Sequence, residues 1–265
     1  MARPPVSCSR SAHRDRALGR GDCHHLPGGR CRALAARGRR PLSETQFVHA
    51  LALGLDPAWR RLPDSQRRTT CADFVSSVEQ ARDVKTFAYT MVGLKPGIDL
   101  LLWRLGPSLE SLEESAAAAL RCGMGTWLSV RESFVGLIRP SQYVKKPTPQ
   151  EQSLFSGERS RYLIVYPFTK SADWYLTDPD TRQRVMNEHM KVGHGYPQVR
   201  QLLAYSFGVD DQDFVVAYET DDLAAFGELV RALRSTESRR STVRDTPILT
   251  GIHRPLSELA ELLGA

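Results

Sequence analysis

The sequence predicts an α+β protein built from two ferredoxin-like repeats, each with the element order β-α-β-β-α-β. Apolar runs of strand length occur four times in each half, and a stretch with helical spacing follows the first and the third run. A segment containing Pro and Gly over residues 144–160 predicts a linker between repeats at 43–143 and 161–265. Strands in this order form an antiparallel sheet with both helices on one face. Two such sheets either pair face to face or close into a barrel.

Turn and capping residues set the boundaries in the first repeat. Lys95-Pro96-Gly97 separates two apolar runs and indicates a hairpin. Ser108 is a favourable N-cap for the second helix, which runs to Leu120 and stops near Gly123. The predicted strands are 47–53, 85–92, 99–105 and 133–138, and the predicted first helix is 63–83.

The second repeat shows the same succession of patterns. The turn Gly208-Val209-Asp210-Asp211 joins two apolar runs as a hairpin. Between the first strand and the first helix, we expect a short polar link that carries Lys170 and Trp174. The predicted strands are 162–168, 201–209, 213–219 and 248–253, and the predicted helices are 178–192, 223–238 and 257–263.

The net charge of +6 is concentrated in the first 42 residues. These hold ten Arg and two Asp, a net charge of +8, so the rest of the chain carries a net charge of −2. The segment lacks apolar periodicity and is rich in Pro, Gly, Ser and Arg, which predicts a disordered basic tail. A targeting peptide and a misplaced start site are alternative explanations of the same composition.

Nucleic-acid binding is disfavoured, although a basic chain and the β-α-β-β-α-β order both occur in RNA-binding proteins. The run 213–219 is acidic at both ends and lacks the basic, glycine-containing aromatic motif of an RNA-recognition sheet. The sequence therefore predicts no nucleic-acid partner.

The remaining composition predicts a cytoplasmic protein. No run approaches the ~18 apolar residues of a membrane span. The five cysteines do not form a disulfide framework, so a reducing compartment is expected. Cys71 and Cys122 are isolated in the sequence, and we expect both to be small buried side chains.

Candidate functional residues cluster in the stretch 166–211. Tyr166, Lys170 and His189 place an oxidisable phenol, a cation and an imidazole on neighbouring predicted elements. This combination suggests a site for an anionic, redox-active ligand, and haem is the obvious candidate.

The same stretch contains a set of aromatic, charged and turn residues, and matching positions continue to residue 247. They are Tyr166-Pro167-Phe168, Lys170, Trp174-Tyr175-Leu176, Glu188-His189, Gly193, Tyr196-Pro197, Ser206-Phe207-Gly208, Asp210-Asp211, Arg234, Glu237 and Thr246-Pro247. The pattern resembles the chlorite dismutase-like haem protein family, and most closely its coproheme decarboxylase branch, over roughly residues 45–255.

The resemblance implies a fold, a reaction and partners. The fold is a dimeric α/β-barrel formed within one chain, assembled into a ring that is usually a pentamer in this branch. The reaction is the hydrogen peroxide-dependent decarboxylation of two propionates of coproheme, iron coproporphyrin III, which gives haem b. A transient contact with a ferrochelatase that delivers the substrate is also implied.

The resemblance assigns the chemistry to His189 and Tyr166. His189 lies fifteen residues after Trp174, the spacing of the family's proximal histidine, and would ligate the iron. Tyr166 would be the catalytic phenol whose radical attacks a propionate. The alternatives are a helical histidine without a ligand and a core tyrosine such as Tyr162. His194 would lie on another helical face, at the surface.

Further residues are implied as contacts of the porphyrin. Lys170 and Arg239 would pair with propionates, and Tyr143 could add a hydrogen bond. Trp174 would pack near the haem edge. The alternative for Lys170 is a solvated loop lysine, and Arg240 shows how Arg239 could be misassigned by one residue.

The residue above the iron separates the branches of the family. Counting back seven residues from Gly208 gives Gln201, the residue type used by some coproheme decarboxylases, whereas chlorite dismutases use an arginine. Arg200 is adjacent, and neighbouring strand residues face opposite sides, so only one of them can line the site. Chlorite dismutation and haem binding without turnover therefore remain alternative functions.

Overall fold

The computed structural model describes residues 46–139, 143 and 158–264, all within one compact unit that spans residues 44–265. The predictions for residues 1–42 and for most of the linker 144–160 lie outside the described residues. The elements of the first half are β1 (Phe47–Leu55), η1 (Trp59–Arg61), α1 (Asp64–Glu79), β2 (Lys85–Lys95), β3 (Ile98–Gly106), α2 (Leu109–Leu120), η2 (Gly123–Trp127) and β4 (Leu128–Leu137). Strand β4 thus begins five residues before its predicted start at 133.

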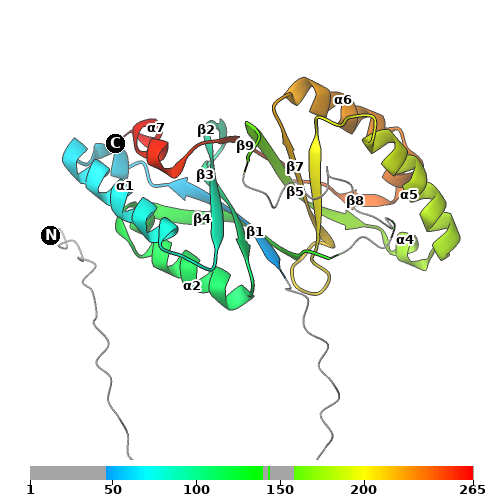
Figure 1. The fold of residues 1–265 in the computed structure, drawn as a ribbon, viewed down its shortest axis with the longest axis horizontal. Helices are drawn as coiled ribbons and strands as arrows, with labels where there is room; N and C mark the ends of the chain where they lie inside the picture. The colour runs from blue at the N-terminus through cyan, green and yellow to red at the C-terminus, as the bar shows by residue number, and fades with distance from the viewer. Residues whose placement is uncertain (1–45, 140–142, 144–157, 265) are drawn as a thin grey trace, which may run out of the picture. The chain divides into compact units, whose positions relative to one another are not determined.

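The second half contains a further set of strands and helices, and α7 packs back onto the first half. They are β5 (Tyr162–Lys170), α4 (Ala172–Leu176), α5 (Pro179–Gly193), β6 (Arg200–Tyr205), β7 (Phe214–Thr220), α6 (Leu223–Arg234), η4 (Glu237–Ser241), β8 (Thr242–Arg244), β9 (Leu249–His253), η5 (Leu256–Glu258) and α7 (Leu259–Leu263). In Figure 1, α1 and α2 lie beside β1–β4, and α4, α5 and α6 gather beside β5 and β7.

Several boundaries in the second half differ from the prediction. Lys170 is the last residue of β5 and Trp174 lies on α4, so the predicted polar link was wrong. Strand β6 ends at Tyr205 because the following residues form a turn that is tied to β4. Helix α6 ends at Arg234 rather than at residue 238, since the next residues form η4. Strand β8 was not predicted, because pairing with β5 defines it rather than its own pattern.

The strand pairings form a closed sequence. Strands β1–β4 follow the spatial order β4-β1-β3-β2, and the second half follows the order β9-β5-β7-β6. Strand β2 pairs with β9, and β4 meets β6 at Leu137 and Tyr205. The β2–β3 hairpin turns at Gly97, whose positive φ of 73° is a conformation that glycine adopts without strain.

Side chains reinforce the short contact between β4 and β6. The Ser206 hydroxyl donates to the Val135 carbonyl at 2.6 Å, and the Asp210 carboxylate accepts from the Val135 amide at 2.9 Å. The turn after β6 therefore uses side chains to bond the backbone of β4. This gives the motif Ser206-Phe207-Gly208 and the following aspartates a structural role in joining the two halves.

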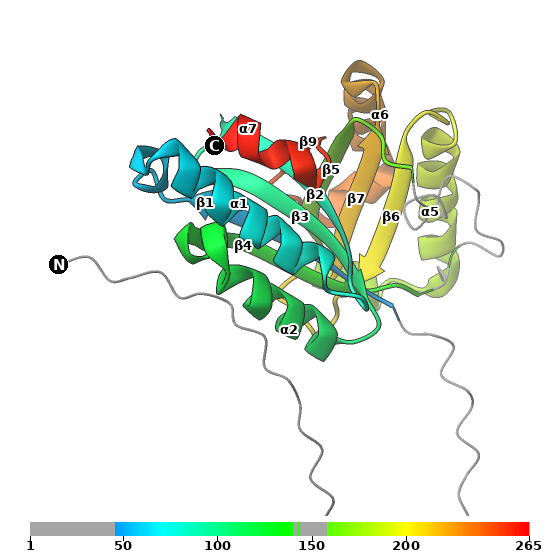
Figure 2. The same ribbon diagram turned by 60° about the vertical axis from the view of Figure 1, so that its left-hand side comes forward.

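Two clusters of buried side chains form the core around the strands of the first half. One cluster, on the face that the strands of both halves share, includes Trp103 and Leu105 together with Leu163 and Leu202. The other fills the space between β1–β3 and the helices α1 and α2, which lie side by side in Figure 2. The predicted N-cap of α2 is confirmed, because Ser108 and Ser111 form a reciprocal capping box.

The two described cysteines differ in their surroundings. Cys71 is fully buried on α1, which confirms the prediction. Cys122 is only partly buried, so its predicted burial was wrong. It precedes η2, where its thiol contacts the Asp73 carbonyl at 3.6 Å.

Within the part of the chain that the structure describes, no helix has the length and apolar character to cross a bilayer. The same part contains no group of three or more His, Cys, Asp or Glu residues arranged to hold a metal ion.

A buried ionic network lies on the shared face of the strands. Glu219 is fully buried, and its carboxylate accepts from the Tyr89 hydroxyl at 2.5 Å and from Arg200 at 2.8 Å. Arg159 lies 3.6 Å from the same carboxylate. Burial raises the pKa of Glu219, and these three partners oppose that shift. The network joins β2 of the first half to β6 and β7 of the second.

We expect Glu219→Ala to lower the free energy of unfolding by about 3–5 kcal/mol, because it removes a buried carboxylate that bonds Tyr89 and Arg200 and lies beside the buried Arg159. Urea denaturation followed by circular dichroism measures the change. Glu228→Ala, at an exposed position of α6, is the matched control and should change stability by less than about 0.5 kcal/mol. Equal stability of the two variants would show that the network does not contribute to the free energy of unfolding as expected.

Candidate functional site

One face of β5, β6 and β7 is less completely covered than the equivalent face of the first half. In the first half, Leu51 and Leu102 are only 4% and 2% exposed. Helix α1 covers them with the side chains of Cys71, Phe74 and Val78. The corresponding cluster in the second half receives Phe226, Leu229 and Leu233 from α6, but among the described residues α5 contributes none. Leu203 on β6 is 41% exposed. Among the described residues, part of this sheet face around Leu203 is therefore left exposed.

Tyr166 lies on this face. It is in the middle of β5 and packs on the cluster that contains Ile164, Val216 and Tyr218. Its ring stacks on that of Tyr218, with centroids 6.1 Å apart and planes inclined by 29°. Burial, and then the neighbouring Tyr218, raise the pKa of Tyr166 well above its usual value, so the phenol is protonated at neutral pH.

Gln201 faces the same side as Tyr166, and Arg200 faces the opposite side. On β6, Gln201 is directly opposite Tyr218, whereas Arg200 is opposite Glu219 and forms the buried ion pair with it. Residues directly opposite each other in antiparallel strands project from the same face of the sheet. Gln201 therefore shares the face of Tyr166, and Arg200 does not.

His189 is carried by α5, whose start is well defined. The Asp178 side chain caps the helix by accepting from the Thr181 amide at 2.9 Å, and Pro179 occupies the first turn. The Nδ1 atom of His189 is buried and has no hydrogen-bond partner among the described residues. Burial, and secondarily the charge of Lys170, lower the pKa of His189 to about 4. The imidazole is therefore neutral at pH 7, the form that binds iron.

Lys170 is buried rather than solvated, so the loop-lysine alternative is wrong. Its ammonium group donates to the Ser238 carbonyl at 2.7 Å and to the hydroxyls of Ser238 and Ser241 at 3.0 and 3.2 Å. It also lies 4.6 Å from the centre of the Trp174 ring. Burial, and then the charge of Arg239, lower the pKa of Lys170 to about 8.

Arg239 lies close enough to Lys170 to affect its titration, and it is already paired. Its guanidinium is 2.5 Å from the Asp245 carboxylate, which also lies 3.9 Å from Arg234. Arg240 is exposed. After a hydrogen bond from Arg184, the charge of Arg240 helps to lower the pKa of Glu237. Arg239 therefore lies on η4 near Lys170, and an anion bound to it would share its guanidinium with Asp245.

Tyr143 and Trp174 lie near the same helices. The Tyr143 carbonyl accepts from Gln183 of α5 at 3.5 Å, and Tyr143 influences the pKa of Tyr175 on α4. Trp174 is buried under Lys170. His194, beyond the end of α5, is exposed as expected.

The sequence interpretation missed residues that position Lys170. Besides Ser238 and Ser241, Asp213 accepts from the Lys170 amide and from the Tyr175 hydroxyl, both at 2.7 Å. These contacts bring together positions about 40 and 70 residues apart, so no local pattern indicates them. Tyr218 could have been found from the sequence. It lies two residues after Val216 on β7, and residues two apart on a strand project from the same face, here the face of Tyr166.

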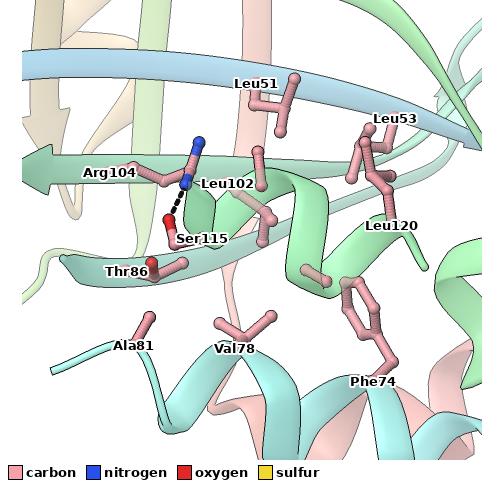
Figure 3. A pocket seen from close by; sticks show the side chains of 12 residues that line it. Leu51, Leu53, Phe74, Val78, Ala81, Thr86, Leu102, Arg104, Ser115 and Leu120 are labelled. Carbon is pink, nitrogen blue, oxygen red and sulfur yellow. Dashed lines mark hydrogen bonds between the residues drawn. The ribbon is translucent and has the colours of Figure 1, made fainter. Parts of the chain in front are cut away.

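A small cavity lies elsewhere, between the sheet and the helices of the first half (Figure 3). Its volume is about 10 Å³, which accommodates about one water molecule. Its lining is mostly leucine and other apolar side chains, with Arg104 hydrogen-bonded to Ser115. It contains none of the predicted site residues and is too small for a porphyrin.

The residues on the open face fit the haem that the sequence resemblance implies. His189 offers a neutral imidazole with a buried nitrogen that has no partner among the described residues, and Tyr166 and Gln201 lie on one face of the second-half sheet. Lys170 and Arg239 supply positive charge at the end of β5 and on η4. A planar, anionic ligand with a metal that takes one imidazole matches this donor set.

Comparison with known proteins gives consistent results. The family model for chlorite dismutase matches residues 65–254. A coproheme decarboxylase from Mycolicibacterium smegmatis is 31% identical over 182 residues, which cover 68% of this chain and 78% of the relative. An arginine-to-glutamate variant of chlorite dismutase from Candidatus Nitrospira defluvii has a TM-score of 0.76 and 28% identity, covering 83% of this chain and 96% of that chain. The same dismutase in complex with imidazole gives 0.75 and 28%, covering 83% and 95%.

Proposed function

Because this chain belongs to the chlorite dismutase family, we propose that it is a coproheme decarboxylase that converts iron coproporphyrin III to haem b with hydrogen peroxide. The observation that carries the proposal is the pairing of His189, with its buried and unpartnered Nδ1, with a sheet face bearing Tyr166 and Gln201. Haem-dependent oxidation is the chemistry of this family, and the decarboxylase relative has the named activity.

We assign His189 as the iron ligand and the basic residues as contacts of the propionates. Lys170, Arg239 and Tyr143 would hold carboxylates of the porphyrin through charge-assisted and phenolic hydrogen bonds. Trp174 would hold Lys170 in place, since its ring covers the ammonium group. The serines that now accept from Lys170 would keep that group oriented while it binds an anion.

The iron porphyrin, when bound, supplies the oxidising equivalents obtained from peroxide. Tyr166 would lose one electron and one proton and become a phenoxyl radical. It would then take a hydrogen atom from a propionate carbon and return to a phenol. The propionate would then lose carbon dioxide and give one further electron to the same peroxide-derived oxidising equivalents that accepted the electron of Tyr166, which leaves a vinyl group. Tyr166 starts as a neutral phenol at pH 7, as any tyrosine of ordinary pKa does, and its raised pKa extends that form to higher pH.

Gln201 favours decarboxylation over chlorite dismutation. An amide on the iron side of the sheet can hydrogen-bond peroxide, but it lacks the fixed positive charge with which a guanidinium holds an oxyanion. Arg200 forms an ion pair with Glu219 on the opposite face of the sheet. We therefore propose that this chain releases little oxygen from chlorite.

Several finer features belong to the same proposal. We interpret the closed strand pairings as a barrel of two ferredoxin-like domains, with residues 144–160 as the linker. We further propose a cytoplasmic, ring-shaped homo-oligomer, with a pentamer as the expected size, and a transient contact with a ferrochelatase. Residues 1–42 would be dispensable.

Mass spectrometry of the porphyrin after addition of iron coproporphyrin and peroxide tests the function. We expect loss of two carboxyl groups and accumulation of haem b. Unchanged porphyrin would leave only haem binding, and rapid sustained oxygen release from chlorite would identify a dismutase. Either result would overturn the proposal.

Lys170 gives the proposal a pH dependence. Its amine is protonated below its pKa of about 8, so we expect the affinity for iron coproporphyrin to fall as the pH rises through 8, by at most about tenfold per pH unit. In the free protein, the pKa lies below the ordinary value of 10.5, so the folded form binds fewer protons than the unfolded form between about pH 8 and 10.5. The stability contribution of Lys170 therefore rises with pH across that range.

Absorbance titrations of the porphyrin between pH 7 and 9 measure this affinity. Lys170→Met should bind more weakly at pH 7 and lose most of the pH dependence. Lys191→Met, at an exposed lysine of α5, is the control and should behave as the wild type. A full pH dependence in Lys170→Met would assign the effect to another group.

A further inference from the structure

Asp245 is a carboxylate within the group of cations to which we assign the propionates. It directly follows β8, the short strand that pairs with the end of β5. Its Oδ2 atom lies 2.5 Å from the guanidinium of Arg239 on η4 and 3.9 Å from that of Arg234, the last residue of α6. The side chains of Asp245, Arg239 and Arg234 are 23%, 39% and 55% exposed, so a ligand can reach them from solvent.

The two arginines contact this carboxylate differently. The contact with Arg239 is a hydrogen-bonded ion pair, whereas the contact with Arg234 is too long for a hydrogen bond. Both arginines approach the same oxygen of Asp245. A shift of about 1 Å toward Arg234 would therefore bring that oxygen within hydrogen-bond distance of the second guanidinium. Asp245 thus has another cation beside it if it leaves Arg239.

The cations of this group need a counter-charge when no ligand is bound. The Lys170 ammonium donates to the carbonyl and hydroxyl of Ser238, the residue directly before Arg239, and both acceptors are uncharged. Like charges held close together repel each other, and a neighbouring carboxylate offsets that repulsion. Asp245 supplies such a carboxylate in the free protein. A propionate carries the same group and the same charge, so it would compete with Asp245 for the Arg239 guanidinium.

We propose that Asp245 is an affinity-determining residue of the substrate site, which pairs with Arg239 while the site is empty and moves to Arg234 when a propionate takes its place. This inference rests on the proposed function, because the propionate is that of the proposed substrate. The exchange replaces one carboxylate by another on the same guanidinium, and no covalent bond is made or broken. Loss of the internal ion pair offsets part of the attraction between Arg239 and the ligand, which lowers the affinity for substrate and product alike.

The first experiment measures the affinity for metal-free coproporphyrin III by fluorescence titration. This probe has the carboxylates of the substrate but no iron, so its binding requires neither ligation by His189 nor peroxide. We expect Asp245→Asn to bind it about two- to fivefold more tightly than the wild type, the range that corresponds to one partly exposed ion pair. Glu228→Gln, the same loss of one negative charge at an exposed position of α6, is the control and should leave the affinity nearly unchanged. Equal affinity of Asp245→Asn and the wild type would overturn the inference.

Double variants test whether Asp245 acts through the two arginines. Arg239→Met should bind more weakly, and addition of Asp245→Asn to it should then change the affinity no more than Glu228→Gln does. A full gain in that background would overturn the inference, because Asp245 would then act through its charge alone. Arg234→Met should weaken binding while Asp245 is present and have no effect together with Asp245→Asn. Weakening in both backgrounds would make Arg234 a direct contact of the ligand and overturn the proposed movement of Asp245.

These affinities are independent of turnover, so the inference and the proposed function fail in different ways. If the wild type binds coproporphyrin but does not decarboxylate iron coproporphyrin, the proposed function is overturned, and the comparison of variants still decides the role of Asp245. If neither the wild type nor Asp245→Asn binds coproporphyrin, both are overturned.

Discussion

Replacement of Tyr166 by phenylalanine will abolish decarboxylation while iron coproporphyrin still binds. The rate should fall by about a thousandfold or more, because the hydroxyl that gives up the hydrogen atom is the only group removed. The ring packs in an apolar cluster and stacks on that of Tyr218, and phenylalanine keeps the ring, so the shape of the site is retained. Lys170 and Arg239 remain in place, and with them most of the electrostatic attraction for the propionates.

Mass spectrometry of the porphyrin after peroxide addition measures the reaction, and absorbance titration measures binding. Tyr162→Phe is the matched control, and it should retain wild-type activity. The variant at position 166 should also keep a cooperative thermal transition. Loss of two carboxyl groups at the wild-type rate in Tyr166→Phe would remove this residue from the mechanism.

We expect His189→Ala to lose the spectrum of histidine-ligated high-spin iron entirely. The imidazole is neutral at pH 7 because burial depresses its pKa, and its Nδ1 atom has no partner among the described residues. Porphyrin should still bind through its propionates, so affinity alone is a weak measure of ligation. Exogenous imidazole should restore the spectrum, because alanine leaves a space of the right size and polarity.

Electronic absorption and electron paramagnetic resonance of the complex with iron coproporphyrin provide the readout. His194→Ala, just beyond the end of α5, is the control for loss of an exposed imidazole and should keep the wild-type spectrum. An unchanged high-spin spectrum in His189→Ala would assign the iron to another ligand.

Local patterns determined the succession of helices and strands. Ser108 predicted a helix start that the capping box confirms, and Gly97 marked the hairpin between β2 and β3. These features depend on residues within one or two turns of each other, so a linear reading contains the necessary information. Predictions deteriorated where long-range pairing defines an element, as for β8, or where a turn is tied to a distant strand, as after β6.

The sequence by itself named the chemical groups of the proposed site, because Tyr166, Lys170 and His189 are close along the chain and their spacing resembles a known family. Only the tertiary structure decided which sheet face those groups occupy, which partners they bond and which protonation state they adopt. The pairing of β6 with β7 turns Gln201 toward the face of Tyr166 and commits Arg200 to Glu219. Serines about 70 residues from Lys170 hold its ammonium group and help to bury it, and burial of His189 leaves its imidazole neutral. Strand register and burial depend on contacts between distant segments, and these contacts have no counterpart in a local pattern.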